Sequence, residues 1–139
     1  MVKFRAMANP ILTLNPPFHG LSAIVNVVGR VGPSEVNNNA DVRVVQRLSQ
    51  LGAGASAAGV KIGLPAVTGN YDAATGFWIY HVQFVQRRTH PTQIVDGIVS
   101  PAHGSSYAAD THWAIVLFNA LAKDARPTEF AAFLSSGGA

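Results

Sequence analysis

The chain has 139 residues, the size of one domain, and its composition already excludes several classes of protein. Hydrophobic residues make up 48% of the chain and charged residues only 12%, so it is not an intrinsically disordered protein. The net charge of +3 comes from scattered lysines and arginines whose only doublet is Arg87-Arg88, which argues against nucleic-acid binding. The lack of cysteine excludes disulfides and thiolate metal sites.

The N-terminal region is expected to be extended. Residues 1–20 are rich in proline and asparagine, which predicts an arm without helix, and residues 22–31 alternate well enough to predict one short strand. No apolar run is long enough for a Sec signal or a membrane span. We therefore expect cytoplasmic synthesis, with delivery to the periplasm or assembly into a secretion or injection particle by another route.

Three helices are predicted after this arm, over residues 40–52, 72–88 and 110–123. The first has Asn39 or Asp41 as its N-cap and Gly52 as its stop signal. The third is closed by Arg126-Pro127, and residues 128–134 add one further turn or helix.

Two segments of the sequence echo each other. Residues 67–75 and 95–103 both run apolar, polar, glycine, any residue, apolar, and then reach a polar helix start. A glycine at this place allows a positive φ, so each segment predicts a tight turn followed by an apolar anchor for the next helix.

Four elements in this order resemble the peptidoglycan-binding-domain-like family. Residues 41–48 (DVRVVQRL), 68–75 (TGNYDAAT), 79–83 (IYHVQ) and 95–101 (VDGIVSP) match its leading helix, first turn, glutamine-ended helix and second turn. The entry into the first helix, residues 27–32 (VVGRVG), is also similar to small proteins associated with contractile injection and type VI secretion systems.

This resemblance covers residues 40–122 and implies a mainly α fold. The expected fold is a three-helix bundle with two glycine turns, plus an N-terminal extended arm and one short β-strand. Its parts are an arm and strand at residues 1–36, a peptidoglycan-binding-like helical domain at 37–126 and a C-terminal tail at 127–139. Thr68, Val82 and Ser100 stand where the family has Asp, Phe and Gly, and the loop at 52–66 is long enough to cover the groove between helices.

The sequence contains no recognisable set of catalytic residues. His103 and Asp110 have the spacing of a zinc-peptidase motif, but no histidine follows His112 and Glu129 is the only later glutamate, so a third ligand and a base are missing. Glu35 lies at the opposite end of the chain from Glu129, and no carboxylate pair of a glycosidase is evident. We expect no catalytic residue, no metal and no cofactor.

The remaining expectation is binding. Wall ligands are held by aromatic faces with amide and charged donors in a shallow groove, and the residues of this type near the second helix are Tyr71, Trp78, Tyr80, Gln83 and Arg87. Trp78 shares a face with Val82 and Val85, which favours the core over a ligand site, and Gln83 could instead bond backbone groups of the first turn.

The resemblance therefore implies non-catalytic binding of bacterial cell-wall peptidoglycan. The alternative is a structural or adaptor protein of a secretion or phage-like contractile injection apparatus, with the N-terminal arm engaging a neighbouring protein. Low charge and the lack of a signal peptide favour the adaptor, whereas the matched motifs favour the wall ligand.

Overall fold

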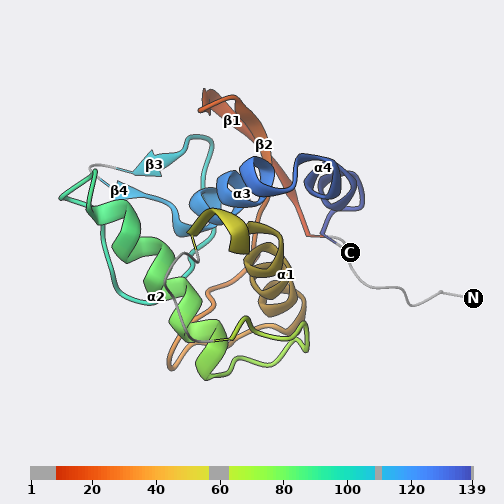
Figure 1. Ribbon diagram of the computed structural model, residues 1–139, viewed down its shortest axis with the longest axis vertical. Coiled ribbons are helices and arrows are strands. Elements are labelled where there is room, and N and C mark those ends of the chain that lie inside the picture. The colour runs from red at the N-terminus through yellow and green to blue at the C-terminus, as the bar shows by residue number, and fades with distance from the viewer. Residues whose placement is uncertain (1–8, 57–62, 109–110, 139) are drawn as a thin grey trace, which may run out of the picture.

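The computed structural model, which describes residues 9–56, 63–108 and 111–138, consists of four helices with a two-stranded hairpin at one edge and a second, very short pair of strands (Figure 1). The helices are α1 (Asn39–Ser56), α2 (Ala73–Arg87), α3 (Ala114–Ala125) and α4 (Pro127–Ser135). The strands are β1 (Ile11–Phe18), β2 (Leu21–Val25), β3 (Tyr107–Ala108) and β4 (Thr111–His112). The expected three-helix bundle with an extended arm and a single strand is therefore wrong.

The described part of the expected arm, from Ile11 to Phe18, is instead half of an antiparallel hairpin. β1 pairs with β2 from Ile11 opposite Val25 to Phe18 opposite Leu21, and the register shifts between Thr13 and Phe18. Pro16 and Pro17 fall in this irregular stretch, where a missing N–H breaks no ladder hydrogen bond. The prolines that predicted an extended arm therefore lie between two stretches that pair as ordinary strands.

The predicted strand at residues 22–31 is shorter than expected. β2 ends at Val25 because the buried Asn26 turns its side chain inward, where it accepts from the N–H and donates to the carbonyl of Ala102, both at 3.0 Å. Val31 forms only an isolated bridge with Val99. Beyond Val25, hydrogen bonds from the Asn26 side chain therefore take the place of strand pairing.

The first helix is longer than predicted at its C-terminal end. The helix continues through Gly52, which was expected to stop it, to Ser56. A Cβ at Gly52 would lie 3.1 Å from the Cβ of Leu121, so the glycine serves instead to let α1 pack closely on α3. The cap is Asn38, whose Oδ1 accepts from the N–H of the second helical residue at 3.0 Å, rather than Asn39 or Asp41.

The other helices follow the sequence closely. α2 is confirmed, with Asp72 as its N-cap. α3 begins four residues later than predicted, because residues 111–112 form β4 instead of a first helical turn, and it ends before Arg126-Pro127 as expected. α4 is the terminal helix predicted as one of two outcomes, and it contributes Phe130 and Phe133 to the core.

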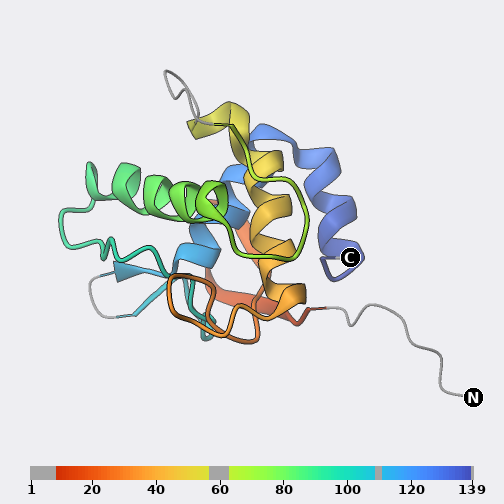
Figure 2. The ribbon, with the colours of Figure 1, turned by 90° about the horizontal axis from the view of Figure 1, so that it is seen from below.

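Helices α1 and α3 form the centre of the molecule, with α2 on one side and α4 on the other (Figures 1 and 2). The core residues with no exposed surface come from β2, from α1, from α2 and α3 and from the loops: Ile24, Val25, Val27, Val31, Val42, Val44, Val45, Leu48, Ile79, Val99, Ile115, Val116 and Ala122. In the part of the chain that the structure describes, no helix has the length and apolar character needed to span a bilayer.

The first glycine turn is held by a buried glutamine of α1. The Oε1 of Gln46 accepts from the N–H groups of Thr68 and Gly69 at 2.9 Å, and its Nε2 donates to the carbonyl of Asn70 at 3.0 Å. Gly69 has a φ of +81°, which side chains rarely tolerate. The Gln46 side chain therefore ties the turn to α1 with the hydrogen bonds that a neighbouring strand would otherwise provide.

The second glycine turn repeats this arrangement from α2. The Oε1 of Gln83 accepts from the N–H of Gly97 at 2.8 Å, and its Nε2 donates to Asp96 Oδ1 at 3.1 Å and to the Ile98 carbonyl at 3.0 Å. Gly97 has a φ of +75°. The echo in the sequence is thus a structural repeat, and Gln83 serves the second turn rather than the first.

Replacing Gln46 tests how much this clamp stabilises the fold. Gln46→Leu keeps the size of the side chain but leaves the buried N–H of Gly69 without an acceptor and removes the bond to the Asn70 carbonyl, so we expect the free energy of unfolding to fall by about 2 kcal/mol. Gln50→Leu is the matched control, because Gln50 donates a single bond, to the Pro65 carbonyl, from a half-buried position on the same helix. Equal losses for the two variants in urea unfolding would contradict the clamp.

Candidate functional site

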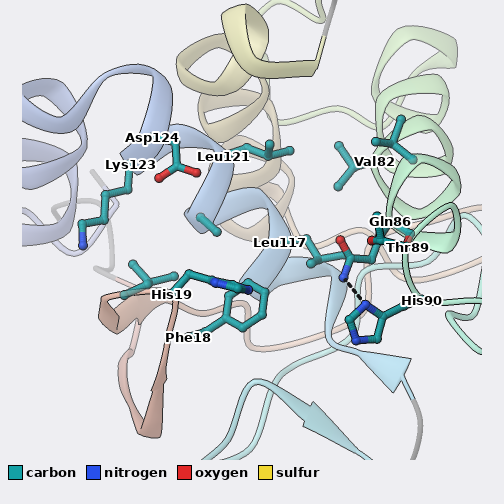
Figure 3. A pocket seen from close by; sticks show the side chains of 13 residues that line it. Phe18, His19, Val82, Gln86, Thr89, His90, Leu117, Leu121, Lys123 and Asp124 are labelled. Atoms are coloured by element: carbon teal, nitrogen blue, oxygen red, sulfur yellow. Dashed lines mark hydrogen bonds between the residues drawn. The ribbon is translucent and has the colours of Figure 1, made fainter.

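A groove of about 400 Å³ lies where α2 and α3 separate next to the tip of the β1–β2 hairpin (Figure 3). Figure 3 shows Leu117 and Leu121 of α3 on one side and Val82 of α2 on the other. Its apolar lining consists of Phe18, Leu21, Val82, Val85, Leu117, Ala120 and Leu121, and its polar lining of His19, Gln86, Thr89, His90, Lys123 and Asp124. The groove therefore has apolar walls and a polar rim.

Helical spacing brings these side chains to one place. Val82, Val85 and Thr89 recur every three or four residues along α2 and just beyond its end, so they share one side of it. Ala120 presents only a methyl group on the facing side of α3, which leaves room between the two helices. The open space thus results from a small residue where the helices diverge.

The hairpin tip closes one end of the groove. His19 and Gly20 connect the strands with positive φ values of 48° and 81°, as the two central residues of a tight hairpin turn require. The Nζ of Lys123 donates to the Gly20 carbonyl at 2.7 Å and so ties the tip to α3. Phe18 extends from the tip, and its ring centroid lies 5.0 Å from that of His112.

Two histidines, His90 and His112, meet close to Phe18, and His90 lines the groove. The rings of His90 and His112 are 4.6 Å apart and nearly perpendicular, and Gln86 Nε2 lies 3.4 Å from the Nδ1 atom of each. Burial lowers the pKa of His112 below its ordinary value of 6.5, and the charges of His90 and His19 lower it further. His112 is therefore held neutral to a lower pH than an ordinary histidine.

The described residues contain no group of three or more His, Cys, Asp and Glu side chains that could hold a metal ion. Asp124 is the only carboxylate among the residues that line the groove. Of the zinc-peptidase spacing considered above, His103 is exposed and stacks edge-on against Trp113, and Asp110 lies outside the described residues. The groove thus offers binding groups: an amide, a hydroxyl, imidazoles, an ammonium and a carboxylate.

Two of the five residues expected to bind a ligand are internal. Trp78 and Gln83 are each only 2% exposed. The Trp78 indole N–H donates to the Gly63 carbonyl at 3.2 Å, and Gln83 holds the second glycine turn. These side chains therefore have structural partners in place of a ligand surface.

The other three residues keep some surface, away from the groove. Tyr80 is 52% exposed, and Arg87 is exposed and donates from Nε to the Gln93 carbonyl at 3.1 Å. Tyr71 is half-buried, and its pKa is raised by burial and, less strongly, by the charge of Asp72. None of the five residues lines the groove.

Sequence reasoning missed the groove because its signals lie in distant parts of the chain. Val82 and Val85 read as ordinary core positions of a helix, and nothing local marks Phe18 and His19 as their neighbours. The described part of the loop expected to cover a groove, residues 63–66, contributes no lining side chain. Comparisons with family models, with curated proteins and with solved structures gave no match for this chain.

The lowered pKa of His112 makes stability depend on pH. Because the unfolded chain binds a proton at a higher pH than the folded protein, the free energy of unfolding is fully retained above about pH 6.5 and falls as the pH drops through that value. We expect His112→Gln to reduce the difference in urea midpoint between about pH 7.5 and about pH 5.5. The control is His103→Gln, at an exposed histidine, and an equal reduction there would contradict this assignment.

Proposed function

We propose that the protein is a non-catalytic module that binds bacterial cell-wall peptidoglycan in the groove between α2 and α3. The observation that carries this proposal is the combination of apolar walls with adjacent opposite charges, Lys123 and Asp124, at the rim. A concave site of this size with a few polar groups is typical of ligand pockets.

The chemistry of the groove suits the peptide stems of the wall together with the adjoining sugar. Such stems carry small methyl side chains, free carboxylates and, at a diamino acid, an ammonium group. Methyl groups would pack against Leu117 and Leu121, a carboxylate would pair with Lys123, and an ammonium would pair with Asp124. Gln86 and Thr89 on α2 supply hydrogen-bonding groups for peptide amides on the opposite side.

The resemblance to the peptidoglycan-binding-domain-like family supports the same ligand. Its matched elements include α2, which forms one wall of the groove, and the two glycine turns, which Gln46 and Gln83 hold. The hairpin tip at Phe18 and His19 is an addition to that pattern, and it narrows the groove at one end. The proposed specificity of this chain therefore depends partly on residues outside the family motifs.

The second candidate function is an adaptor in a secretion or injection apparatus. The observation that favours it is the outer side of α2, which carries two exposed aromatic side chains, Tyr80 at 52% and Phe84 at 45%. The N-terminal arm that was expected to engage a neighbour is built into the fold from Asn9 onward, and residues 1–8 lie outside the described residues.

Binding to purified sacculi tests the wall proposal. Ala120→Leu places a larger side chain in the groove, so we expect it to lower the fraction of protein that sediments with insoluble peptidoglycan about tenfold. Ala132→Leu is the matched control, since Ala132 is exposed on α4 far from the groove lining. Thermal unfolding of both variants shows whether the fold is retained.

Two further arms of this experiment separate the alternatives. Tyr80→Ala/Arg87→Ala alters the outer side of α2, and loss of binding in this variant alone would move the wall site there. Binding that vanishes at moderate salt would reflect only attraction of a basic protein to an anionic polymer. Absence of wild-type binding would contradict the wall proposal and leave the adaptor.

A further inference from the structure

The outer face of α2, defined here as Tyr80, Phe84, Arg87 and Arg88, is the side of this helix that points away from the core. All four residues are exposed. Both ribbon views show α2 at the edge of the molecule, on the side opposite α4 (Figures 1 and 2). Aromatic and arginine side chains are the types enriched at the centres of protein interfaces.

The charges of this face have no carboxylate partner in the part of the chain that the structure describes. Among the described residues the only ion pair joins Arg30 and Glu35, so neither Arg87 nor Arg88 has a carboxylate partner. Arg88 lies over the Phe84 ring, 5.7 Å from its centroid, which presents a cationic and aromatic surface together.

The opposite end of the same helix carries a negative charge. Asp72, the N-cap, is exposed, although its Oδ1 accepts from the N–H of Thr75 at 2.8 Å. Asp72 lies eight residues before Tyr80, and Arg87 lies seven residues after it. The two charges are therefore about 10 to 12 Å from Tyr80 along the helix axis, in opposite directions.

We propose that the outer face of α2 is a two-fold interface between two copies of this chain. If the two α2 helices pair antiparallel about Tyr80, Arg87 of each copy comes opposite Asp72 of the other, because these two positions lie about 60° apart around the helix, and the aromatic rings pack at the centre. A two-fold interface requires a self-complementary surface, and nearly equal spacing of opposite charges about an aromatic centre meets that requirement. Antiparallel helix dipoles add a small favourable contribution.

This interface goes beyond the wall proposal and does not depend on it. The groove is lined by Val82, Val85 and Gln86 on the inner side of α2, so a ligand there and a second copy on the outer face would not compete. A single pair of helices buries less area than a standard interface, so we expect a dissociation constant of about 10–100 µM. Two arginines are too few for stable binding to a phosphate backbone, which disfavours a nucleic acid as the occupant.

Sedimentation equilibrium of the full chain from about 10 µM to about 1 mM tests the proposal. We expect the average mass to rise from that of one chain toward that of two. The variants Arg87→Glu/Arg88→Glu and Asp72→Lys each place like charges across the interface, so each should weaken the dimer at least about tenfold. An equimolar mixture of these two variants should dimerise again, since opposite charges then meet at both ends.

Matched controls separate this result from loss of fold. Arg43→Glu/Arg47→Glu makes the same charge change on the exposed side of α1 and should leave the dimer intact. Asp72→Lys also removes a helix cap, so its far-UV spectrum is compared with wild type, and Tyr80→Glu disrupts the centre without touching the cap. A wild-type protein that stays monomeric throughout, or a mixture of folded variants that does not associate, would overturn the proposal. So would loss of the dimer in the α1 control.

Discussion

The fold of this protein depends on side-chain amides that satisfy buried backbone groups. Its sheets are small, so much of the buried backbone outside the helices has no ladder to bond with. Asn119 illustrates the solution: its Oδ1 accepts from the N–H of Val25 at 3.0 Å and its Nδ2 donates to the carbonyl of the same residue at 3.1 Å. Gln93 does the same for both backbone groups of His112 at 3.0 Å. Each buried amide thus makes the two hydrogen bonds that a paired strand residue would make, from a side chain held by a helix or loop.

These amides and one buried carboxylate, Asp41, also position the surfaces that function would use. Gln83 fixes the second turn against α2, and Asp41 accepts from the N–H groups of Val28 at 2.8 Å and Gly29 at 2.9 Å, which holds the chain between β2 and α1. Across the groove, the side of α2 that carries Val82 and Val85 faces the side of α3 that carries Leu117 and Leu121. The inner side of α2 therefore borders the groove, and the outer side, centred on Tyr80, remains free for a second copy.

Local signals predicted α2 and the repeated glycine turns, because helical periodicity and positive-φ glycines leave a mark in a few adjacent residues. They failed where a distant contact decided the outcome. Gly52 has the appearance of a helix stop, but its lack of a side chain allows α1 to approach α3. The candidate site was predicted least well, since Trp78 is a core residue and the groove combines the ends of two helices with a hairpin tip about a hundred residues away from α3 in the chain.

The sequence by itself determined a single basic domain without disulfides, rich in helix, with two repeated glycine turns, because composition, periodicity and turn chemistry are local properties. Only the tertiary structure decided that the N-terminal segment is a core hairpin and that a groove opens beside it. It also decided which side of α2 faces solvent. These features depend on which distant surfaces bury one another, and burial is a property of the whole chain that no local pattern encodes.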